Sequence, residues 1–292
     1  MKPLRSLLFI PGDSAKKLSK VDASGADAVI LDLEDAVAPG NKIAARALVA
    51  DFLAARPRAT RGVQLWVRVN PFDTGLTTDD LAAVVRGDPD GIMQPKIDGP
   101  ADVRRLSDML DGLEHEHGLH RGSIRILPVA TETPIAPFRL GDFADADLPR
   151  LAGLTWGAED LSAAMGASTN LGSDGKWTFT YQLVRSLTLM AAHAAGVPAI
   201  ETLYVDFRDD DGLRASCRAA RAEGFSGRIA IHPSQVAGIN EGFSPSDDEI
   251  AFAKKIIAAF DAKPDVGTVG IDGKMYDIPH LKAARRTLEV VA

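Results

Sequence analysis

The chain has 292 residues, of which 46% are hydrophobic and 25% are charged, and this composition argues against long disorder or a fibrous fold. The formal net charge of -7, together with the lack of a Lys/Arg cluster, disfavours binding to nucleic acid or to an anionic membrane. A single cysteine, Cys217, excludes an internal disulfide and a thiolate metal cluster, and it is consistent with a reducing compartment.

The first apolar run, residues 7–10, is broken by Pro11 and Gly12 and is too short to be a secretory signal. No apolar run along the chain reaches the length that a membrane-spanning helix needs. We therefore expect a cytoplasmic protein with neither a membrane nor a nucleic-acid partner.

Eight short apolar runs, each bounded by Gly or Pro, recur along the chain at residues 7–10, 28–33, 65–69, 91–95, 124–129, 154–156, 197–200 and 229–231. Runs that are apolar on both faces are typical of buried parallel strands. The stretches between them carry helix formers with apolar residues three or four apart, as at residues 41–55, 101–117, 178–195 and 211–223. Eight alternating units predict a (β/α)₈ TIM barrel. An open doubly wound sheet is the weaker alternative, because Pro-Gly-Asp-Ser rather than G-x-G-x-x-G follows the first run.

The chain continues beyond the eighth run. Residues 247–261 predict an amphipathic helix, Asp272 and Gly273 predict a hairpin turn, and a last helix is expected after Pro279. We therefore divide the chain into a barrel catalytic domain, residues 1–245, and a C-terminal helical and hairpin extension, residues 246–292. The extension is either a cap on the outside of the barrel or a lid over an active site, that of a neighbouring subunit included.

Active groups of a (β/α)₈ barrel lie at the carboxyl ends of its strands. At those positions this chain has Glu34, Asp35, Arg68, Asn70, Lys96, Glu132, Glu159, Asp160, His232 and Gln235. Glu132 and Asp160 follow the fifth and sixth runs, so their carboxylates would converge and offer the oxygen ligands that Mg²⁺ prefers. Taken singly, each acidic residue is better explained as a helix cap or a helix-dipole partner, and it is the two together that favour a metal site.

Three basic or neutral side chains at the same end have two interpretations each. Arg68 lies in an apolar strand, where it would bind the carboxylate of a small acid bidentately or form a structural ion pair with Glu34 or Asp35. Lys96 would supply a cation for the acid or for an enolate, or it would pair with a carboxylate of the metal site. His232 would act as a base, or the His-Pro turn would give it a structural or coenzyme-lining role.

Nine short motifs occur in one order: FIPG at 9–12, LEDAV at 33–37, VRVN at 67–70, PK at 95–96, ET at 132–133, GAEDL at 157–161, GFSGRIAIHPSQ at 224–235, FSPS at 243–246 and IDGKMYD at 271–277. Together they cover the chain nearly from end to end. The sequence thereby resembles the citrate lyase β-subunit family and its stand-alone relatives, the malyl-CoA and citramalyl-CoA lyases, within the HpcH/HpaI aldolase superfamily.

The resemblance implies a barrel that assembles as a homotrimer or a dimer of trimers and binds Mg²⁺ through Glu132 and Asp160. It also implies that Arg68 binds the carboxylate of a 2-oxo acid and that Asp277 reaches the active site of a neighbouring subunit. The other implied site residues are Gly157, Ala158 and Glu159, whose backbone would contact the acid, and Glu34 and Asp35, which would surround Arg68 and the metal waters.

The reaction implied by the resemblance is cleavage or formation of a carbon–carbon bond in a 3-hydroxyacyl-CoA such as malyl-CoA, citramalyl-CoA or a citryl thioester. Its products are an acyl-CoA and a 2-oxo acid, with Asp277 as the group that protonates the thioester enolate. Two alternatives remain open. One is a malyl-CoA-type thioesterase, and the other is the β subunit of a citrate lyase complex that acts on an acyl-carrier-protein thioester.

Overall fold

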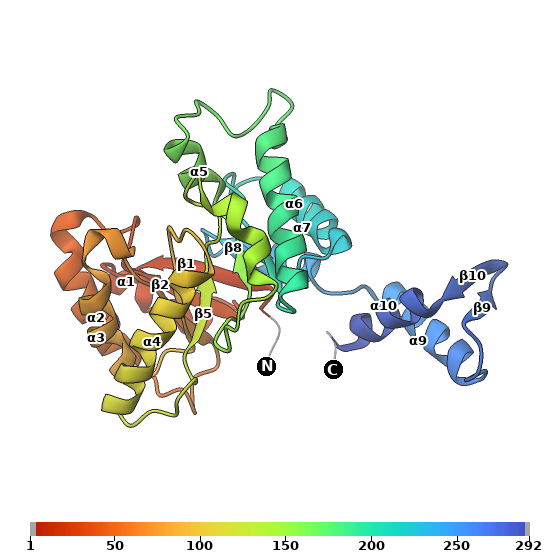
Figure 1. Cartoon of the computed structure of the whole chain (residues 1–292), viewed down its shortest axis with the longest axis horizontal. Helices are drawn as coiled ribbons and strands as arrows, with labels where there is room; N and C mark the ends of the chain where they lie inside the picture. Colours follow the sequence, from red (N-terminus) through yellow and green to blue (C-terminus); the bar gives the residue numbers. More distant parts are fainter. Residues whose placement is uncertain (1–3, 290–292) are drawn as a thin grey trace.

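The computed structural model describes residues 4–289, in which eight parallel strands form a barrel (Figure 1). They are β1 (Ser6–Pro11), β2 (Ala28–Asp32), β3 (Gln64–Arg68), β4 (Gly91–Gln94), β5 (Arg125–Pro128), β6 (Leu154–Thr155), β7 (Ala199–Glu201) and β8 (Gly227–Ala230). Their hydrogen-bonded order is β5-β4-β3-β2-β1-β8-β7-β6. Two isolated parallel bridges, Ile126 to Leu151 and Val129 to Thr155, close the gap between β5 and β6. The predicted (β/α)₈ barrel is confirmed, and the doubly wound alternative is wrong.

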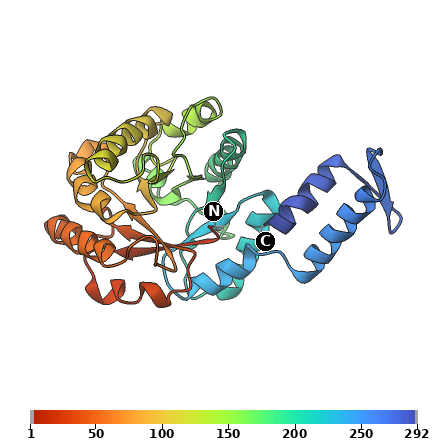
Figure 2. The ribbon, with the colours of Figure 1, turned by 90° about the horizontal axis from the view of Figure 1, so that it is seen from below.

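Helices surround the strands, as Figure 2 shows. The α-helices of the barrel are α1 (Ala15–Leu18), α2 (Lys42–Ala54), α3 (Thr77–Val84), α4 (Pro100–Glu116), α5 (Ala158–Ala164), α6 (Phe179–Ala194), α7 (Asp210–Glu223) and α8 (Gln235–Gly242). The short 3-10 helices are η1 (Val21–Ala23), η2 (Pro39–Asn41), η3 (Phe72–Thr74), η4 (Val85–Gly87) and η5 (Ala136–Phe143), the last of which takes the place of an α-helix between β5 and β6. Within the described part of the chain, no helix combines the length and apolarity needed to cross a bilayer.

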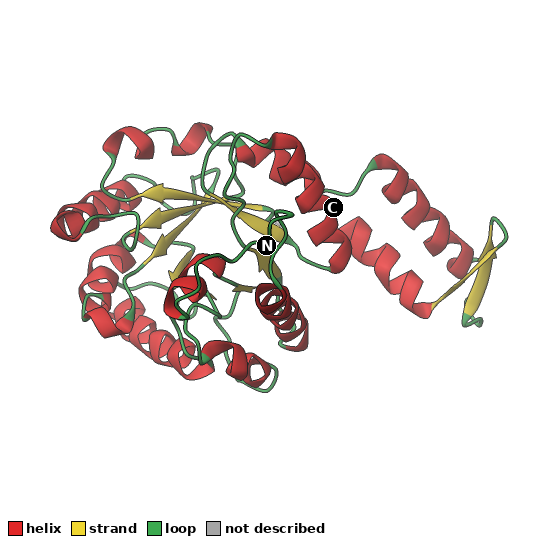
Figure 3. Ribbon diagram, turned by 90° about the horizontal axis from the view of Figure 1, so that it is seen from above, coloured by secondary structure: helices red, strands yellow, loops and turns green. Residues whose placement is uncertain are grey.

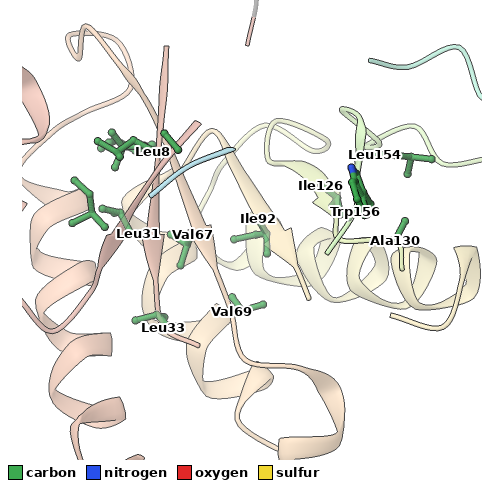
Figure 4. Close-up of a cluster of buried hydrophobic side chains, with 14 of the residues drawn as sticks. Leu8, Leu31, Leu33, Val67, Val69, Ile92, Ile126, Ala130, Leu154 and Trp156 are labelled. Atoms are coloured by element: carbon green, nitrogen blue, oxygen red, sulfur yellow. The ribbon is translucent and has the colours of Figure 1, made fainter. Parts of the chain in front are cut away.

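Alternation of side chains along each strand separates the barrel interior from the layer beneath the helices. The interior cluster includes Leu7, Ile30, Trp66, Met93, Leu127, Ile200 and Ile229. The outer cluster includes Leu8, Leu31, Val67, Ile92, Ile126 and Leu154, which Figure 4 shows along successive strands. Gly91 makes room for the interior cluster, because a Cβ atom there would overlap the Trp66 ring. The two layers fix the barrel and therefore the relative positions of its strand ends.

A buried ion pair supports the wall where β5 meets β6. The Arg150 guanidinium contacts Glu114 with an Nη2–Oε2 distance of 2.6 Å, and the exposed fractions of the two side chains are 3% and 0%. Glu114 also accepts hydrogen bonds from the backbone N–H groups of Gly122 and Ile124. Burial acts to raise the pKa of Glu114, but Arg150 and the two amides together hold that pKa below its usual value.

Replacing Arg150 with Met should lower the free energy of unfolding by about 3–5 kcal/mol, because it leaves the buried Glu114 carboxylate without its cation. Urea unfolding at neutral pH measures this change. The contribution of the Glu114 carboxylate to the free energy of unfolding should be lost with acidification. The loss should occur as the pH falls from the unfolded-state pKa of about 4.3 through the lower folded-state pKa. The exposed Arg121 provides a matched control, since Arg121→Met removes another partner of the same cluster and should leave the midpoint nearly unchanged. Equal effects of both variants would contradict the prediction.

The C-terminal tail comprises α9 (Asp247–Asp261), β9 (Thr268–Ile271), β10 (Lys274–Asp277) and α10 (Ile278–Glu289). Ser246 and Glu249 form a capping box at the start of α9, and Asp272 and Gly273 turn the hairpin with positive φ angles. The tail has its own apolar cluster of Ala253, Ile256, Phe260, Val269, Ile271, Leu281 and Ala284. The predicted helices and hairpin are confirmed. The division of the chain between residues 245 and 246 stays a prediction. The first and last residues of the two predicted parts, 1–3 and 290–292, lie outside the described range.

The tail leaves the barrel at the amino ends of the strands. Arg5, which directly precedes β1, donates a 3.0 Å hydrogen bond from Nη1 to Ser244 Oγ, just before the tail begins. In Figure 3 the strand arrows point away from the side on which the tail projects. The tail of a subunit therefore extends away from the carboxyl ends of its own strands.

Candidate active site

Arg68, the last residue of β3, is held by a carboxylate on the neighbouring strand. Asp32 lies directly opposite Arg68 in the β2–β3 register, and it accepts hydrogen bonds from Nε and Nη2 at 2.8 and 2.7 Å. Arg68 Nη1 lies 2.8 Å from Glu34 Oε2. Desolvation acts to lower the pKa of Arg68, but the bonds and charge of Asp32 reverse this and raise it. Arg68 is thus a fixed, permanently charged group at the barrel mouth.

Asp32, which lies inside the second apolar run, was not predicted from the sequence as a site residue. The predicted partner Glu34 does contact Arg68, but the predicted partner Asp35 does not: the structure pairs Asp35 with Lys96 instead, with a Nζ–Oδ2 distance of 2.9 Å. The side chain of Asp35 is more than half exposed, whereas those of Asp32 and Glu34 are buried. A lone carboxylate in an apolar run beside a strand that contains a buried arginine is the signal that could have identified Asp32.

Lys96 joins three carboxylates, two from the loop after β2 and one from the start of α5. Its Nζ atom contacts Glu34 Oε1, lies 2.9 Å from Asp35 Oδ2, and lies 3.2 Å from Asp160 Oδ1. Desolvation acts to lower the pKa of Lys96, but hydrogen bonds to Glu34 and Asp35 outweigh it and raise that pKa. Of the two interpretations of Lys96, the structure agrees with the second, in which Lys96 pairs with a carboxylate of the metal site. That carboxylate is Asp160.

A second lysine, also not predicted from the sequence, fixes the loop that carries Glu34. Lys42, at the start of α2, donates from Nζ to the carbonyl oxygens of Leu33 and Glu34 at 2.9 and 2.8 Å, and to Asn70 Oδ1 at 2.7 Å. An ammonium group that satisfies two backbone carbonyls holds the turn after β2 in one conformation. Lys42 therefore supports the position of the acidic residues without contacting the site.

Glu132, which follows β5, is a buried acidic group with an exposed fraction of 5%. Its Oε2 atom accepts a 2.7 Å hydrogen bond from the backbone N–H of Lys96, a residue with a left-handed φ of 50°. Burial, followed by the negative charges of Asp160 and Glu34, raises the pKa of Glu132 well above its usual value. Such a group fits a cation-binding role, because a divalent cation between Glu132 and Asp160 would remove the electrostatic penalty.

The donor set around Glu132 and Asp160 consists of carboxylate oxygens, which suits Mg²⁺. Over residues 4–289 there is no preformed group of three or more His, Cys, Asp or Glu side chains that could hold a metal. An ion held by these two carboxylates would therefore take its remaining ligands from water or substrate oxygens, as Mg²⁺ commonly does. The residues present fit a substrate-accessible magnesium ion rather than a closed structural site.

A cavity at the carboxyl ends of the strands brings the proposed metal, acid and backbone residues together. It is lined by Phe9, Arg68, Met93, Val129, Glu132, Thr155, Trp156, Gly157, Ala158, Glu159, Asp160, Thr202, Leu203 and Ile229. Two more open hollows, both beside Arg61, contain none of these residues. The chemistry-bearing side chains therefore select the cavity at the strand ends as the candidate site.

The backbone groups predicted to contact the acid are not equivalent. The N–H of Gly157 donates to Thr131 Oγ1 at 3.1 Å, so this amide already has a partner. Ala158 and Glu159 begin α5, whose first turn has no side-chain cap. The Glu159 side chain accepts a 2.9 Å hydrogen bond from Asn170 and is thereby held outside the cluster of Glu132 and Lys96. Backbone contacts with an acid would accordingly come from Ala158 and Glu159.

Asp277 and His232 lie apart from the carboxylate cluster. Asp277 ends β10 in the tail and forms a 2.5 Å contact with His280 Nδ1, which lowers the Asp277 pKa. His232 Nδ1 lies 2.7 Å from Ser234 Oγ, and its ring stacks on Phe207 with a centroid distance of 4.8 Å. These local contacts favour the structural or coenzyme-lining interpretation of His232. The role predicted for Asp277 stays a prediction.

Gly157 should be intolerant of any side chain. A Cβ atom there would lie 2.7 Å from Glu132 Cγ and 2.9 Å from Glu132 Oε1, so Gly157→Ala must displace the carboxylate. We expect about 1–3 kcal/mol of destabilisation and at least tenfold weaker Mg²⁺ binding, measured by urea unfolding and isothermal titration calorimetry. Gly112 in the middle of α4 has open space around it, so Gly112→Ala is the matched control and should stabilise the protein by up to about 1 kcal/mol. Unchanged Mg²⁺ affinity in Gly157→Ala would contradict the proposed position of the metal.

Comparison with known proteins agrees with this geometry. Residues 5–233 match the family model described as HpcH/HpaI aldolase/citrate lyase. A (3S)-malyl-CoA thioesterase of Cereibacter sphaeroides is 35% identical over 98% of this chain and 94% of its own length. A mitochondrial citramalyl-CoA lyase of Rattus norvegicus is 33% identical over 97% of this chain and 84% of its own length.

Among solved structures, protein CitE from Mycobacterium tuberculosis in complex with magnesium, acetoacetate and coenzyme A is 32% identical. It superposes with a TM-score of 0.78, and the match covers 99% of this chain and 97% of that one. The resemblance and the enzyme class drawn from the nine motifs are thereby confirmed. The chain belongs to the HpcH/HpaI aldolase/citrate lyase family, and the relatives that are named as lyases support a lyase.

Proposed function

We propose that this enzyme cleaves, or in the reverse direction forms, the C2–C3 bond of a 3-hydroxyacyl-CoA with the help of Mg²⁺. The observation that carries the proposal is the meeting of Arg68, Lys96, Glu132 and Asp160 around one cavity at the carboxyl ends of the strands. A fixed guanidinium beside a pair of carboxylates suits a substrate that has both a carboxylate and a neighbouring hydroxyl or oxo oxygen. The products would be an acyl-CoA and a 2-oxo acid.

Glu132 and Asp160 would hold the magnesium ion in this proposal. When bound, the ion would act as a Lewis acid toward the hydroxyl or oxo oxygen of the substrate. The chain contributes the geometry: the amide of Lys96 orients one Glu132 oxygen, and Gly157 leaves space for the other. Lys96 Nζ orients Asp160 through its 3.2 Å contact.

Arg68 would bind the carboxylate of the 2-oxo acid, and the backbone of Ala158 and Glu159 would contact the same acid. The guanidinium is held in place by Asp32 before substrate arrives, so little side-chain entropy is lost on binding. Glu34 would be the acidic group that exchanges protons near the reacting oxygen. Its burial, opposed by Arg68 and Lys96, still raises its pKa. Asp35 would assist by holding Lys96.

Asp277 would carry the proton to and from the enolate carbon of the acyl-CoA, in the active site of a neighbouring subunit. The tail supports this proposal, because it leaves the barrel at the amino ends of the strands and cannot cover its own site (Figure 1). Asp277 would have to exchange its His280 contact for a drier environment, which would raise its pKa and make it a usable acid. Assembly as a homotrimer or a dimer of trimers, and a cytoplasmic location, are parts of the same proposal.

Hydrolysis of the thioester is the second candidate, and the similarity to a (3S)-malyl-CoA thioesterase favours it. Incubating racemic malyl-CoA or citramalyl-CoA with the enzyme, in MgCl₂ or in EDTA, distinguishes the two reactions. A lyase releases glyoxylate or pyruvate in the presence of Mg²⁺ and leaves the thioester intact in the acyl-CoA product. Free coenzyme A together with malate or citramalate, and no 2-oxo acid, would reject the lyase proposal.

The same assay addresses the third alternative, a subunit that acts on an acyl-carrier-protein thioester. Turnover of the CoA thioester by the purified chain alone supports an independent enzyme. Activity that appears only when the substrate is attached to a carrier protein would support the citrate lyase complex instead.

A further inference from the structure

We propose that Lys96 competes with Mg²⁺ for the carboxylate of Asp160, so that its ammonium group weakens the affinity of the site for the ion. When Mg²⁺ binds, the ammonium group would release Asp160 and keep its other carboxylate partners. This inference rests on the part of the proposed function that assigns Mg²⁺ to Glu132 and Asp160. It identifies a residue that opposes metal binding beside the residues that would support it.

The backbone of Lys96 is fixed beside the proposed metal ligands. Lys96 follows β4 and has a left-handed φ of 50°, a conformation that residues other than glycine seldom adopt. Its N–H donates to Glu132 Oε2 at 2.7 Å, which holds the main chain of Lys96 against the carboxylate of Glu132. The lysine side chain therefore starts from a fixed point within reach of the proposed metal site.

The ammonium group of Lys96 contacts one of the two proposed ligands. Its Nζ atom lies 3.2 Å from Asp160 Oδ1. Mg²⁺ binds carboxylate oxygens at about 2.0–2.1 Å, so an ion and an ammonium group on the same oxygen would lie no more than about 5 Å apart. Both side chains are less than a third exposed, so solvent screens the repulsion between the two cations only in part. The contact that orients Asp160 before the ion binds therefore also opposes binding of the ion.

Lys96 retains two partners when it releases Asp160. Its Nζ atom contacts Glu34 Oε1 and lies 2.9 Å from Asp35 Oδ2, and neither of these residues is a proposed metal ligand. The contact with Asp160 is the longest of the three. A small shift of the flexible lysine stem toward the loop after β2 would separate the ammonium group from the ion and leave its charge paired.

The negative charge of the site suffices for both cations once they are separated. Besides the Asp32–Arg68 pair, the site has the carboxylates of Glu34, Asp35, Glu132 and Asp160. When ionised, these four groups carry more negative charge than the ammonium group and one Mg²⁺ together carry positive charge. Lys96 would therefore lower the affinity for the ion without excluding it, with the ammonium group on the β2 side and the ion between Glu132 and Asp160.

Calorimetric titration of the full chain with MgCl₂ tests the inference, because it measures the affinity for the ion without a thioester. Lys96→Met keeps most of the side-chain stem and removes the charge, and we expect it to tighten Mg²⁺ binding by at least about tenfold. Lys96→Arg keeps a cation and should bind Mg²⁺ no more tightly than the wild type does. Unchanged or weaker binding in Lys96→Met would overturn the inference, because removal of a lysine that only supports Asp160 would weaken binding.

Lys42→Met is the matched control for a general loss of positive charge near the site. The Nζ atom of Lys42 donates to the carbonyl oxygens of Leu33 and Glu34 and to Asn70 Oδ1, none of which belongs to a carboxylate. Its removal should leave the Mg²⁺ affinity within about threefold of the wild-type value. Tightening equal to that of Lys96→Met would show that net charge rather than a shared carboxylate causes the effect, and it would overturn the inference.

A second variant and a second measurement keep the test independent of one substitution. If Lys96→Met does not fold, Lys96→Gln replaces it, since its amide has no charge and can still donate a hydrogen bond to Glu34. Thermal unfolding in EDTA and at one fixed MgCl₂ concentration should show a larger increase in Tm for the neutral variant than for the wild type, because stabilisation follows the ratio of ion concentration to Kd. An equal or smaller increase would count against the inference.

The outcomes for this inference and for the proposed function are distinguishable. Tighter Mg²⁺ binding by the neutral Lys96 variant, in an enzyme that releases no 2-oxo acid, would support the inference and reject the lyase proposal. Release of a 2-oxo acid by the wild type, with unchanged or weaker Mg²⁺ binding in the variant, would support the lyase proposal and overturn the inference. A lack of Mg²⁺ binding by both proteins would overturn both.

Discussion

Replacing Glu132 with Gln is expected to abolish Mg²⁺-dependent turnover while stabilising the metal-free protein. The substitution keeps the size of the side chain but removes a buried charge, which burial and the charges of Asp160 and Glu34 disfavour. The variant therefore loses a metal ligand and, at the same time, an electrostatic penalty. A purely structural role of Glu132 would give the opposite change in stability.

The expected change in the stability of the metal-free protein with pH has a definite direction. Because the Glu132 pKa is raised in the folded state, the metal-free wild type should lose stability as the pH rises from about 4.3 through the folded-state value. The Gln variant should lack this decline. Saturating Mg²⁺ at about one hundred times its Kd should stabilise the wild type by about 2.7 kcal/mol and should leave the variant unchanged.

Thermal unfolding in EDTA and in MgCl₂ provides this comparison. Asp98→Asn removes an exposed carboxylate that accepts a hydrogen bond from Thr133, the residue after Glu132, and it serves as the matched control. The control should retain both activity and stabilisation by Mg²⁺. A Gln variant that is still stabilised by Mg²⁺ would contradict the assignment of Glu132 as a ligand.

Asp277→Asn should lower kcat by about 10²–10⁴-fold and leave Mg²⁺ binding unchanged, because it removes the proposed carbon acid without touching the metal site. Steady-state kinetics and calorimetry measure the two effects separately. Loss of Mg²⁺ binding in this variant would contradict the division of roles. His280→Gln is a useful companion, since it removes the local partner of Asp277 but should retain most of the activity.

The sharing of active sites can be tested by mixing two inactive variants. In randomly mixed oligomers of Asp277→Asn and Glu132→Gln subunits, about a quarter of the sites would combine an intact barrel with an intact neighbouring tail. Activity should recover to about that fraction of the wild type once native mass spectrometry shows mixed oligomers. No recovery in proven mixed oligomers would place Asp277 outside the neighbour's site.

The barrel was predictable because each strand is an apolar run flanked by turn residues, and because polar residues follow those runs. The same pattern located Arg68, Lys96, Glu132 and Asp160, which the structure brings together around one cavity. The 3-10 helix η5 was not predicted from the sequence. Within residues 136–143, Gly141 weakens α-helix formation, whereas Pro137 lies in the first turn, where proline is tolerated.

The partners within the site were harder to predict, because they depend on the register between strands. Asp32 and Arg68 are opposite each other only through the β2–β3 pairing, and a run of apolar residues gives no register. The role of Gly157 is likewise a packing effect, since it reflects the space that Glu132 occupies. Lys42 is eight residues beyond Glu34 and contacts its carbonyl only after α2 has packed.

Cleavage of the 3-hydroxyacyl-CoA in D₂O, followed by mass spectrometry of both products, tests the carbon–carbon lyase proposal most directly. Protonation of an enolate from solvent-exchanged Asp277 would place one deuterium on the carbon next to the thioester carbonyl. We predict an acyl-CoA with one added deuterium and an equimolar amount of 2-oxo acid. Free coenzyme A with an unlabelled hydroxy acid would contradict the proposal and assign the site to thioester hydrolysis.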